Sequence, residues 1–180
     1  IHQEAQRLVS LINDILGLSQ LDEGAAMPRE SVSLLSLAQE AAASLSAAAQ
    51  AQHVTLTVNG TAGTLTGVRR LLSETVRNLC ENAVKYNVPG GSVTVTVAET
   101  PQAVTLTVAD TGIGIPPADQ SRVFERFYRV DKSHSRAIGG TGLGLSIVKH
   151  AVAYHHGTVQ LDSTPGQGTV ITVTLPKDAA

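Results

Sequence analysis

Three polar side chains on one predicted helix could bind a phosphate-bearing ligand and its metal ion. Asn78, Asn82 and Lys85 lie at i, i+4 and i+7, so they share one helical face. Mg²⁺ prefers hard oxygen ligands, and an amide oxygen supplies one without adding negative charge beside a triphosphate. Lys85 could reach a phosphate from the next turn. Taken alone, the asparagines could equally be ordinary surface residues, and the glycines that follow decide in favour of a site.

Glycine-rich stretches follow this helix at three places: 110–115 (DTGIGI), 139–145 (GGTGLGL) and 166–169 (GQGT). Glycine allows close approach of a backbone to a ligand and adopts positive φ. The bare N–H groups at the start of a helix attract phosphate, and the second stretch leads into a predicted helix. Asp110 ends a predicted strand and could accept a hydrogen bond from an exocyclic amino group such as that of adenine. The alternative for Asp110 is a carboxylate that caps a turn.

Two common phosphate-binding motifs are excluded. Gly112 and Gly114 run into Pro116 and lack a surrounding βαβ unit, so a dinucleotide-binding turn fits poorly. The stretch 140–149 lacks the Gly-Lys-Ser/Thr ending of a P-loop. The sequence therefore favours a nucleotide site built mostly from backbone, with a few side chains providing selectivity.

A long polar segment separates the first two glycine stretches. It begins with residues 124–129 (FERFYR) and continues as a basic stretch to Arg136. A loop of this length inside a compact domain is typically functional, often a lid. Candidates for phosphate contacts are Arg126, Arg129, Lys132 and Arg136, which as isolated residues would be solvated charges.

Hydrophobic periodicity predicts an α+β fold. We expect strands near 31–34, 54–58, 93–97, 104–108, 159–161 and 170–175. Helices are expected over 35–52 and 67–86, and from the second glycine stretch to about His156. Valine and leucine alternate with threonine in most of these strands, which indicates one buried face and one wetter face. The expected architecture is a two-layer sandwich with a mostly antiparallel mixed sheet and helices on one face.

A separate helix is predicted before this fold. Ile1, Leu8, Leu11, Ile15 and Leu18 form an imperfect heptad seam. We expect this seam to pack on another helix, from an absent segment or a second chain. The alternative is a helix that lies on its own domain. Residues 22–28 read as a helix end and a short linker, and because the chain starts at Ile1 inside a helical pattern we expect it to be part of a longer protein.

Composition narrows the range of functions. Net charge is −2 with no basic run, which gives no indication of a nucleic-acid partner. No apolar stretch approaches the roughly 18 residues of a membrane-spanning helix. The only cysteine, Cys80, excludes an internal disulfide, fits a reducing compartment and is predicted to be a packing residue.

The order of these motifs resembles the catalytic, ATP-binding domain of sensor histidine kinases, part of the Bergerat-fold ATPases. The resemblance covers residues 30–176: an N box at 78–86, glycine boxes at 110–114, 140–144 and 166–168, and an F box at 124–129. The helix from Leu8 to Leu21 resembles the second helix of the dimerisation and phosphotransfer hairpin. The segment 127–135 is similar to the corresponding segment of phosphate-regulation-type sensor kinases. The implied division is a partial hairpin helix at 1–24, a linker at 25–29, the ATP-binding domain at 30–176 and a tail at 177–180.

The resemblance implies roles for particular residues. Asp110 would bind the adenine amino group with support from Thr169, and Asn82 with Asn78 would hold Mg²⁺. Lys85 and Arg129 would meet phosphates, and Tyr86 would lie near the nucleotide. The remaining implied contacts are Gly112, Gly114 and Ile115 from the first glycine box and Gly140, Thr141, Gly142, Leu143 and Gly144 from the second. Implied partners are ATP, the hairpin of a homodimer and a response-regulator receiver domain, in the cytoplasmic portion of a membrane protein whose spans lie in missing N-terminal segments.

Two departures shape the expected activity. ATP-hydrolysing relatives carry an acid four residues before the magnesium asparagine, and here that position is Asn78. The His-Glu-Leu-Arg-Thr-Pro-like acceptor box is absent, and His2 does not replace it. We therefore expect ATP binding without self-phosphorylation. The alternatives are a hydrolytic ATPase and a non-catalytic docking module. His155 and His156 are expected to be solvated cap residues, with a metal pair as the alternative.

Overall fold

The computed structural model describes residues 1–24, 26–130 and 140–178. In chain order the elements are α1 (His2–Asp22), β1 (Glu30–Ser33), α2 (Leu34–Ala51), β2 (Thr55–Gly60), β3 (Thr64–Gly67), α3 (Arg69–Lys85), β4 (Ser92–Glu99), β5 (Ala103–Asp110), α4 (Pro117–Gln120), α6 (Gly144–Tyr154), β6 (Thr158–Thr164) and β7 (Gly168–Pro176).

The main sheet has five strands in the order β2-β4-β5-β7-β6. Only the β2–β4 pair is parallel, and the other three pairs are antiparallel. Alternate residues of β4 and β5 are buried, as the valine–threonine alternation predicts. The predicted fold class is confirmed. A second small sheet, β1 with β3, was not predicted, because β3 has only four residues and pairs with a strand more than 30 residues away.

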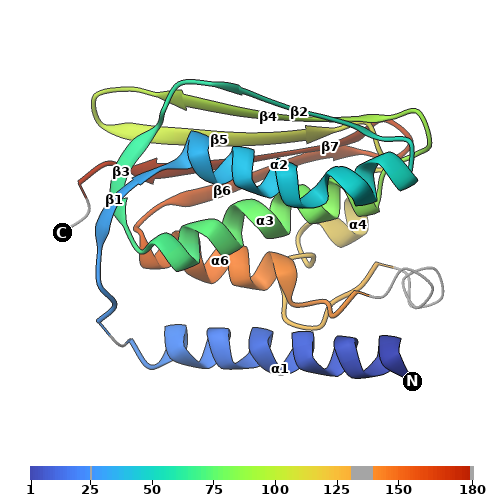
Figure 1. The fold of residues 1–180 in the computed structure, drawn as a ribbon, viewed down its shortest axis with the longest axis horizontal. Helices are drawn as coiled ribbons and strands as arrows, with labels where there is room; N and C mark the ends of the chain where they lie inside the picture. Colours follow the sequence, from blue (N-terminus) through green and yellow to red (C-terminus); the bar gives the residue numbers. More distant parts are fainter. Residues whose placement is uncertain (25, 131–139, 179–180) are drawn as a thin grey trace.

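Helices cover one face of the sheet, and α1 lies beyond them. Figure 1 shows α2, α3 and α6 on the same side of the sheet, with α1 next to α6 on the side away from the strands. The three covering helices lie side by side, since α3 contacts both α2 and α6. This arrangement places the C-terminal half of α3 and the start of α6 near one another.

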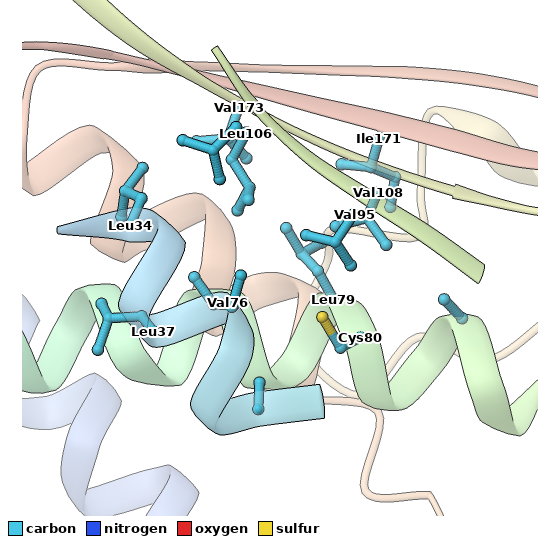
Figure 2. Close-up of a cluster of buried hydrophobic side chains, with 14 of the residues drawn as sticks. Leu34, Leu37, Val76, Leu79, Cys80, Val95, Leu106, Val108, Ile171 and Val173 are labelled. Atoms are coloured by element: carbon cyan, nitrogen blue, oxygen red, sulfur yellow. The ribbon is translucent and has the colours of Figure 1, made fainter. Parts of the chain in front are cut away.

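The core lies between the sheet and helices α2 and α3. Figure 2 shows its aliphatic side chains, which converge from Val95, Leu106, Val108, Ile171 and Val173 on the strands and from Leu34, Leu37, Val76, Leu79 and Cys80 on the helices. Cys80 is fully buried, and burial raises the pKa of its thiol to about 12. The prediction that Cys80 is a packing residue is confirmed.

Helix α1 has two different apolar faces. Leu18 is buried against Leu143 and Ile147, and Leu11 packs beside it. Leu8 and Ile15 point outward and are 60% and 45% exposed. The predicted seam is thus divided: its inner half lies on the chain's own fold, contrary to the main expectation, and its outer half is exposed. None of the helices in the described ranges could serve as a membrane span.

Candidate nucleotide-binding site

The polar face of α3 presents two amides with different surroundings. Asn78 donates its Nδ2 hydrogen to the carbonyl of Glu74 over 2.9 Å, which leaves its Oδ1 facing the start of α6. A Cβ at Gly144 would lie 3.1 Å from that oxygen. Asn82, one turn later and half-buried, makes no side-chain hydrogen bond to any described residue. An amide oxygen that no described residue engages is suited to ligate a hard cation, so the chemistry of Asn82 is compatible with Mg²⁺.

Positive charge gathers where α3 meets the second glycine stretch. A Cβ at Gly140 would lie 3.0 Å from Lys85 Nζ, 3.4 Å from the Tyr86 hydroxyl and 3.7 Å from an Arg129 nitrogen. Burial lowers the pKa of Lys85; Glu81 opposes this shift, while Arg129 and Arg7 add to it. A bound anion would relieve this repulsion, which is what a phosphate site requires.

Asp110 uses one carboxylate oxygen to fix local structure. Its Oδ1 accepts the N–H of Gly112 over 2.8 Å and that of Thr169 over 3.2 Å. Burial raises the pKa of Asp110, and these two hydrogen bonds act in the opposite direction. Its Oδ2 accepts no hydrogen bond from the described part of the chain. The turn-capping alternative is therefore correct for one oxygen, while the other remains available to an amino group.

Thr169 belongs to a hydrogen-bonded group that includes Ser163, a residue that sequence reasoning missed. The two hydroxyls are 2.8 Å apart, and Ser163 also accepts the N–H of Ile115 over 2.8 Å. Ser163 pairs directly with Thr169 across β6 and β7. The available signal was its position opposite Thr169 in the predicted hairpin. This group joins the end of the first glycine stretch to the third.

The glycines at the first and third stretches serve backbone packing. Gly114 has φ +70°, and a Cβ there would lie 2.2 Å from the Thr164 carbonyl oxygen. Gly168 has φ +116°, and a Cβ there would lie 2.0 Å from the carbonyl oxygen of Asp110. These residues allow two turns to approach each other beside Asp110, which differs from the expected approach to a ligand.

The second glycine stretch is anchored on two sides. The Gly142 carbonyl accepts the N–H of Phe127 over 2.9 Å. Leu143 is fully buried against α1 and α6, so its side chain is an anchor and only its backbone can face a ligand. Helix α6 begins at Gly144, where first-turn N–H groups lack acceptors within the helix.

The basic candidates separate into different places. Arg129 lies near Gly140. Arg126 instead forms an ion pair with Asp22 at 2.7 Å and lies 3.4 Å from His150, and its phosphate contact stays a prediction. Lys132 and Arg136 lie outside the described residues.

His155 is a fully buried structural residue, so the expectation of a solvated cap is wrong for it. Its Nε2 accepts the N–H of Val68 over 3.0 Å, and its Nδ1 lies 2.7 Å from the Ala151 carbonyl, to which it donates. Burial lowers the pKa of His155. Both ring nitrogens are used, and the described ranges contain no group of three metal-binding His, Cys, Asp or Glu side chains. The metal-pair alternative therefore has no support.

Comparison with known proteins identifies the family of this chain. The family model for histidine kinase-, DNA gyrase B- and HSP90-like ATPases matches residues 67–179. The sensor-like histidine kinase SenX3 of Mycolicibacterium smegmatis is 39% identical over 97% of this chain and 46% of its own length. Thus the chain spans less than half of that relative.

Two solved structures share the fold. The mycobacterial sensor histidine kinase MprB aligns with a TM-score of 0.71 at 30% identity, over 85% of this chain and all of that one. Full-length ShkA in complex with AMPPNP aligns with a TM-score of 0.80 at 29% identity, over 96% of this chain and 36% of that one.

Proposed function

Because this chain belongs to the histidine kinase-, DNA gyrase B- and HSP90-like ATPase family and carries its histidine-kinase catalytic domain, we propose that it binds Mg-ATP between α3 and the glycine stretches for phosphoryl transfer to a histidine. The observation that carries the proposal is the approach of Gly140 to Lys85 and of Gly144 to Asn78. The start of α6, the amide oxygen of Asn78 and the cations Lys85 and Arg129 therefore lie close together. These groups together can bind a polyphosphate.

Adenine is selected at the other end of the site. Asp110 Oδ2 accepts the exocyclic amino group, while Oδ1 is held by Gly112 and Thr169. Guanine presents a carbonyl oxygen where adenine has that amino group, so GTP would meet a carboxylate with no hydrogen to donate. Ile115 and the Thr169–Ser163 pair support this end, and Gly112 and Gly114 allow the turns around Asp110 to form.

The phosphates lie toward α3. A Mg²⁺ ion held there would supply positive charge to offset the charge of the phosphates. Asn82 supplies a ligand oxygen, with Asn78 beside it. Lys85 and Arg129 contact phosphate oxygens, Tyr86 lies next to them, and the backbone of Gly140, Thr141, Gly142, Leu143 and Gly144 encloses them.

The acceptor is an imidazole on a hairpin helix of the parent protein. A neutral imidazole nitrogen uses its lone pair to form a P–N bond as the bond between the γ-phosphorus and the bridging oxygen breaks. ADP leaves with the electron pair of that P–O bond, and the phosphorylated imidazole releases its remaining N–H proton to water. The imidazole needs no base to activate it, which suits the amide at Asn78. Further proposed features are homodimerisation through the hairpin, relay to a receiver-domain aspartate and a cytoplasmic position in a membrane-anchored parent.

A labelling experiment tests the transfer. The chain is incubated with ATP labelled at the γ-phosphate, with and without a separate sensor-kinase hairpin that carries the acceptor histidine. We expect an acid-labile phosphohistidine on the added hairpin and none on this chain. Phosphohistidine on this chain would contradict the assignment of the acceptor to an added hairpin. Sustained ATP hydrolysis with no labelled hairpin would contradict phosphoryl transfer and favour the hydrolytic alternative.

A further inference from the structure

A polar connection runs from α1 to the second glycine stretch. The Oγ1 hydroxyl of Thr141 donates to Asp14 Oδ2 over 3.1 Å, and the same hydroxyl accepts the N–H of Leu143 over 3.3 Å. These two hydrogen bonds link the middle of α1 to the backbone just before the first turn of α6. That backbone is the part of the site assigned to phosphate.

Apolar packing surrounds this connection. Leu11 and Leu18, which precede and follow Asp14 on the inner face of α1, pack with Leu143 and Ile147. Leu143 is fully buried, so its backbone cannot shift without disturbing this cluster. The inner face of α1 therefore holds the second glycine stretch through both a side-chain hydrogen bond and a hydrophobic contact.

The presence of an aspartate at position 14 indicates a role other than hydrophobic packing. A leucine would continue the stripe formed by Leu11, Leu18 and Leu21, whereas a half-buried carboxylate carries a desolvation cost. Burial raises the pKa of Asp14, against the effects of the Thr141 hydrogen bond and the nearby Arg77. The carboxylate is placed where it can orient one hydroxyl.

We propose that Asp14 is a positioning residue for nucleotide binding: by orienting Thr141 it fixes the backbone of residues 140–144 opposite Asn78 and Lys85. The affinity of the chain for phosphate then depends on contact between α1 and this stretch. The inference rests on the proposed binding of ATP at the same stretch.

Matched variants separate the hydrogen bond from other effects. Asp14→Ala removes the acceptor, whereas Asp14→Asn keeps one and removes the charge. Thr141→Val removes the hydroxyl, and Thr141→Ser keeps it. Asn13→Ala changes an exposed neighbour on α1 and serves as the control. All are made in the complete 180-residue chain.

Calorimetric titration with Mg-ATP is the first readout. We expect Asp14→Ala and Thr141→Val each to weaken binding about five- to tenfold, which is within the range for one ordinary hydrogen bond. The double variant should be no weaker than the weaker single variant, because both changes break the same connection. Asp14→Asn, Thr141→Ser and Asn13→Ala should stay within about twofold of the parent chain. Unchanged affinity in Asp14→Ala, losses that multiply in the double variant, or failure of the conservative variants to rescue would overturn the proposal.

Amide hydrogen exchange without nucleotide is the second readout. We expect Asp14→Ala and Thr141→Val to speed exchange across residues 141–146 while α1 keeps the exchange of the parent chain, since Leu18 still anchors the helix. Unchanged exchange at 141–146 would overturn the positioning role. If the parent chain binds no Mg-ATP, the proposed function fails, and this readout still decides whether Asp14 orders the stretch.

Discussion

Asp110 divides two tasks between the two oxygens of one carboxylate. In Asp110→Asn the amide oxygen can still accept the N–H groups of Gly112 and Thr169, while the nitrogen turns the nucleotide-facing atom into a donor. We expect Mg-ATP binding to weaken by about 1.5–3 kcal/mol, roughly ten- to 150-fold, with little change in the thermal midpoint. Calorimetric titration and a thermal melt measure the two effects.

Asp162→Asn is the matched control for this variant. Asp162 is exposed on β6, and removal of its charge should leave affinity unchanged. Equal binding by the parent chain and Asp110→Asn would show that Asp110 does not recognise adenine.

Gly166 and Gly168, in the turn before Thr169, allow the cost of backbone strain to be measured separately from the cost of a steric clash. Gly166 and Gly168 both have positive φ, but a Cβ at Gly166 meets nothing within 4 Å, whereas one at Gly168 would lie 2.0 Å from the Asp110 carbonyl oxygen. We expect Gly166→Ala to lower the free energy of unfolding by about 1–2 kcal/mol and Gly168→Ala by a further 1–3 kcal/mol, approximately. Urea denaturation measures both, and equal losses would mean that the turns are not packed as described.

Sequence could identify residue types at the site but not every partner. Asn78, Asn82, Lys85 and Asp110 were predicted because their spacing and position at element ends are local properties. Arg126 and Arg129 cannot be told apart from local sequence, since the ion pair of Arg126 with Asp22 joins residues 104 positions apart. The role of Ser163 likewise depends on its partner Thr169 on the neighbouring strand, so it could be identified only from the pairing of β6 with β7.

At the scale of elements, His155 connects the end of α6 to the start of α3. It must be neutral to accept the Val68 N–H, and burial, with the charges of Arg29 and His156, lowers its pKa. A group with a lowered folded-state pKa contributes full stability above its unfolded-state pKa of about 6.5 and loses it as pH falls below that value. We expect the free energy of unfolding to fall below about pH 6.5, by at most roughly 1.4 kcal/mol per pH unit from this group.

Urea denaturation at several pH values checks the role of His155. In His155→Gln the free energy of unfolding should fall less steeply between about pH 7 and pH 5 than in the parent chain. This is the region where the unfolded imidazole titrates. His2→Gln, at an exposed position on α1, should keep the parent's pH dependence. An identical slope in His155→Gln and the parent would assign the acid sensitivity to other groups.

The elements of this fold were predictable where periodicity was strong. The alternation of valine with threonine predicted β4, β5 and β7, and the spacing of apolar residues predicted α2 and α3. The short strand β3 was missed because four residues carry little periodicity and its pairing with β1 is non-local. The inner contact of α1 was only the alternative expectation, because its stripe includes Asp14, whose partner Thr141 lies 127 residues away.

At the scale of the whole molecule, one thiol reports on the integrity of the main core. Cys80 lies fully buried between the sheet and the helices, and its pKa is raised to about 12, so almost no thiolate exists near neutral pH. We expect a thiol reagent at pH 8 to label the native chain only through global unfolding, with a rate that rises with urea as the unfolded population does. Rapid labelling in the absence of denaturant would contradict the described core.

Titration of Mg-ATP against this chain tests the central claim most directly, with GTP and magnesium-free ATP as parallel ligands. The account predicts saturable binding that is tightest for Mg-ATP, because Asp110 selects the adenine amino group and Asn82 adds a ligand to the metal. Loss of binding without magnesium and weak binding of GTP would support both ends of the site. Equal binding of GTP and ATP, or no binding of either, would contradict it.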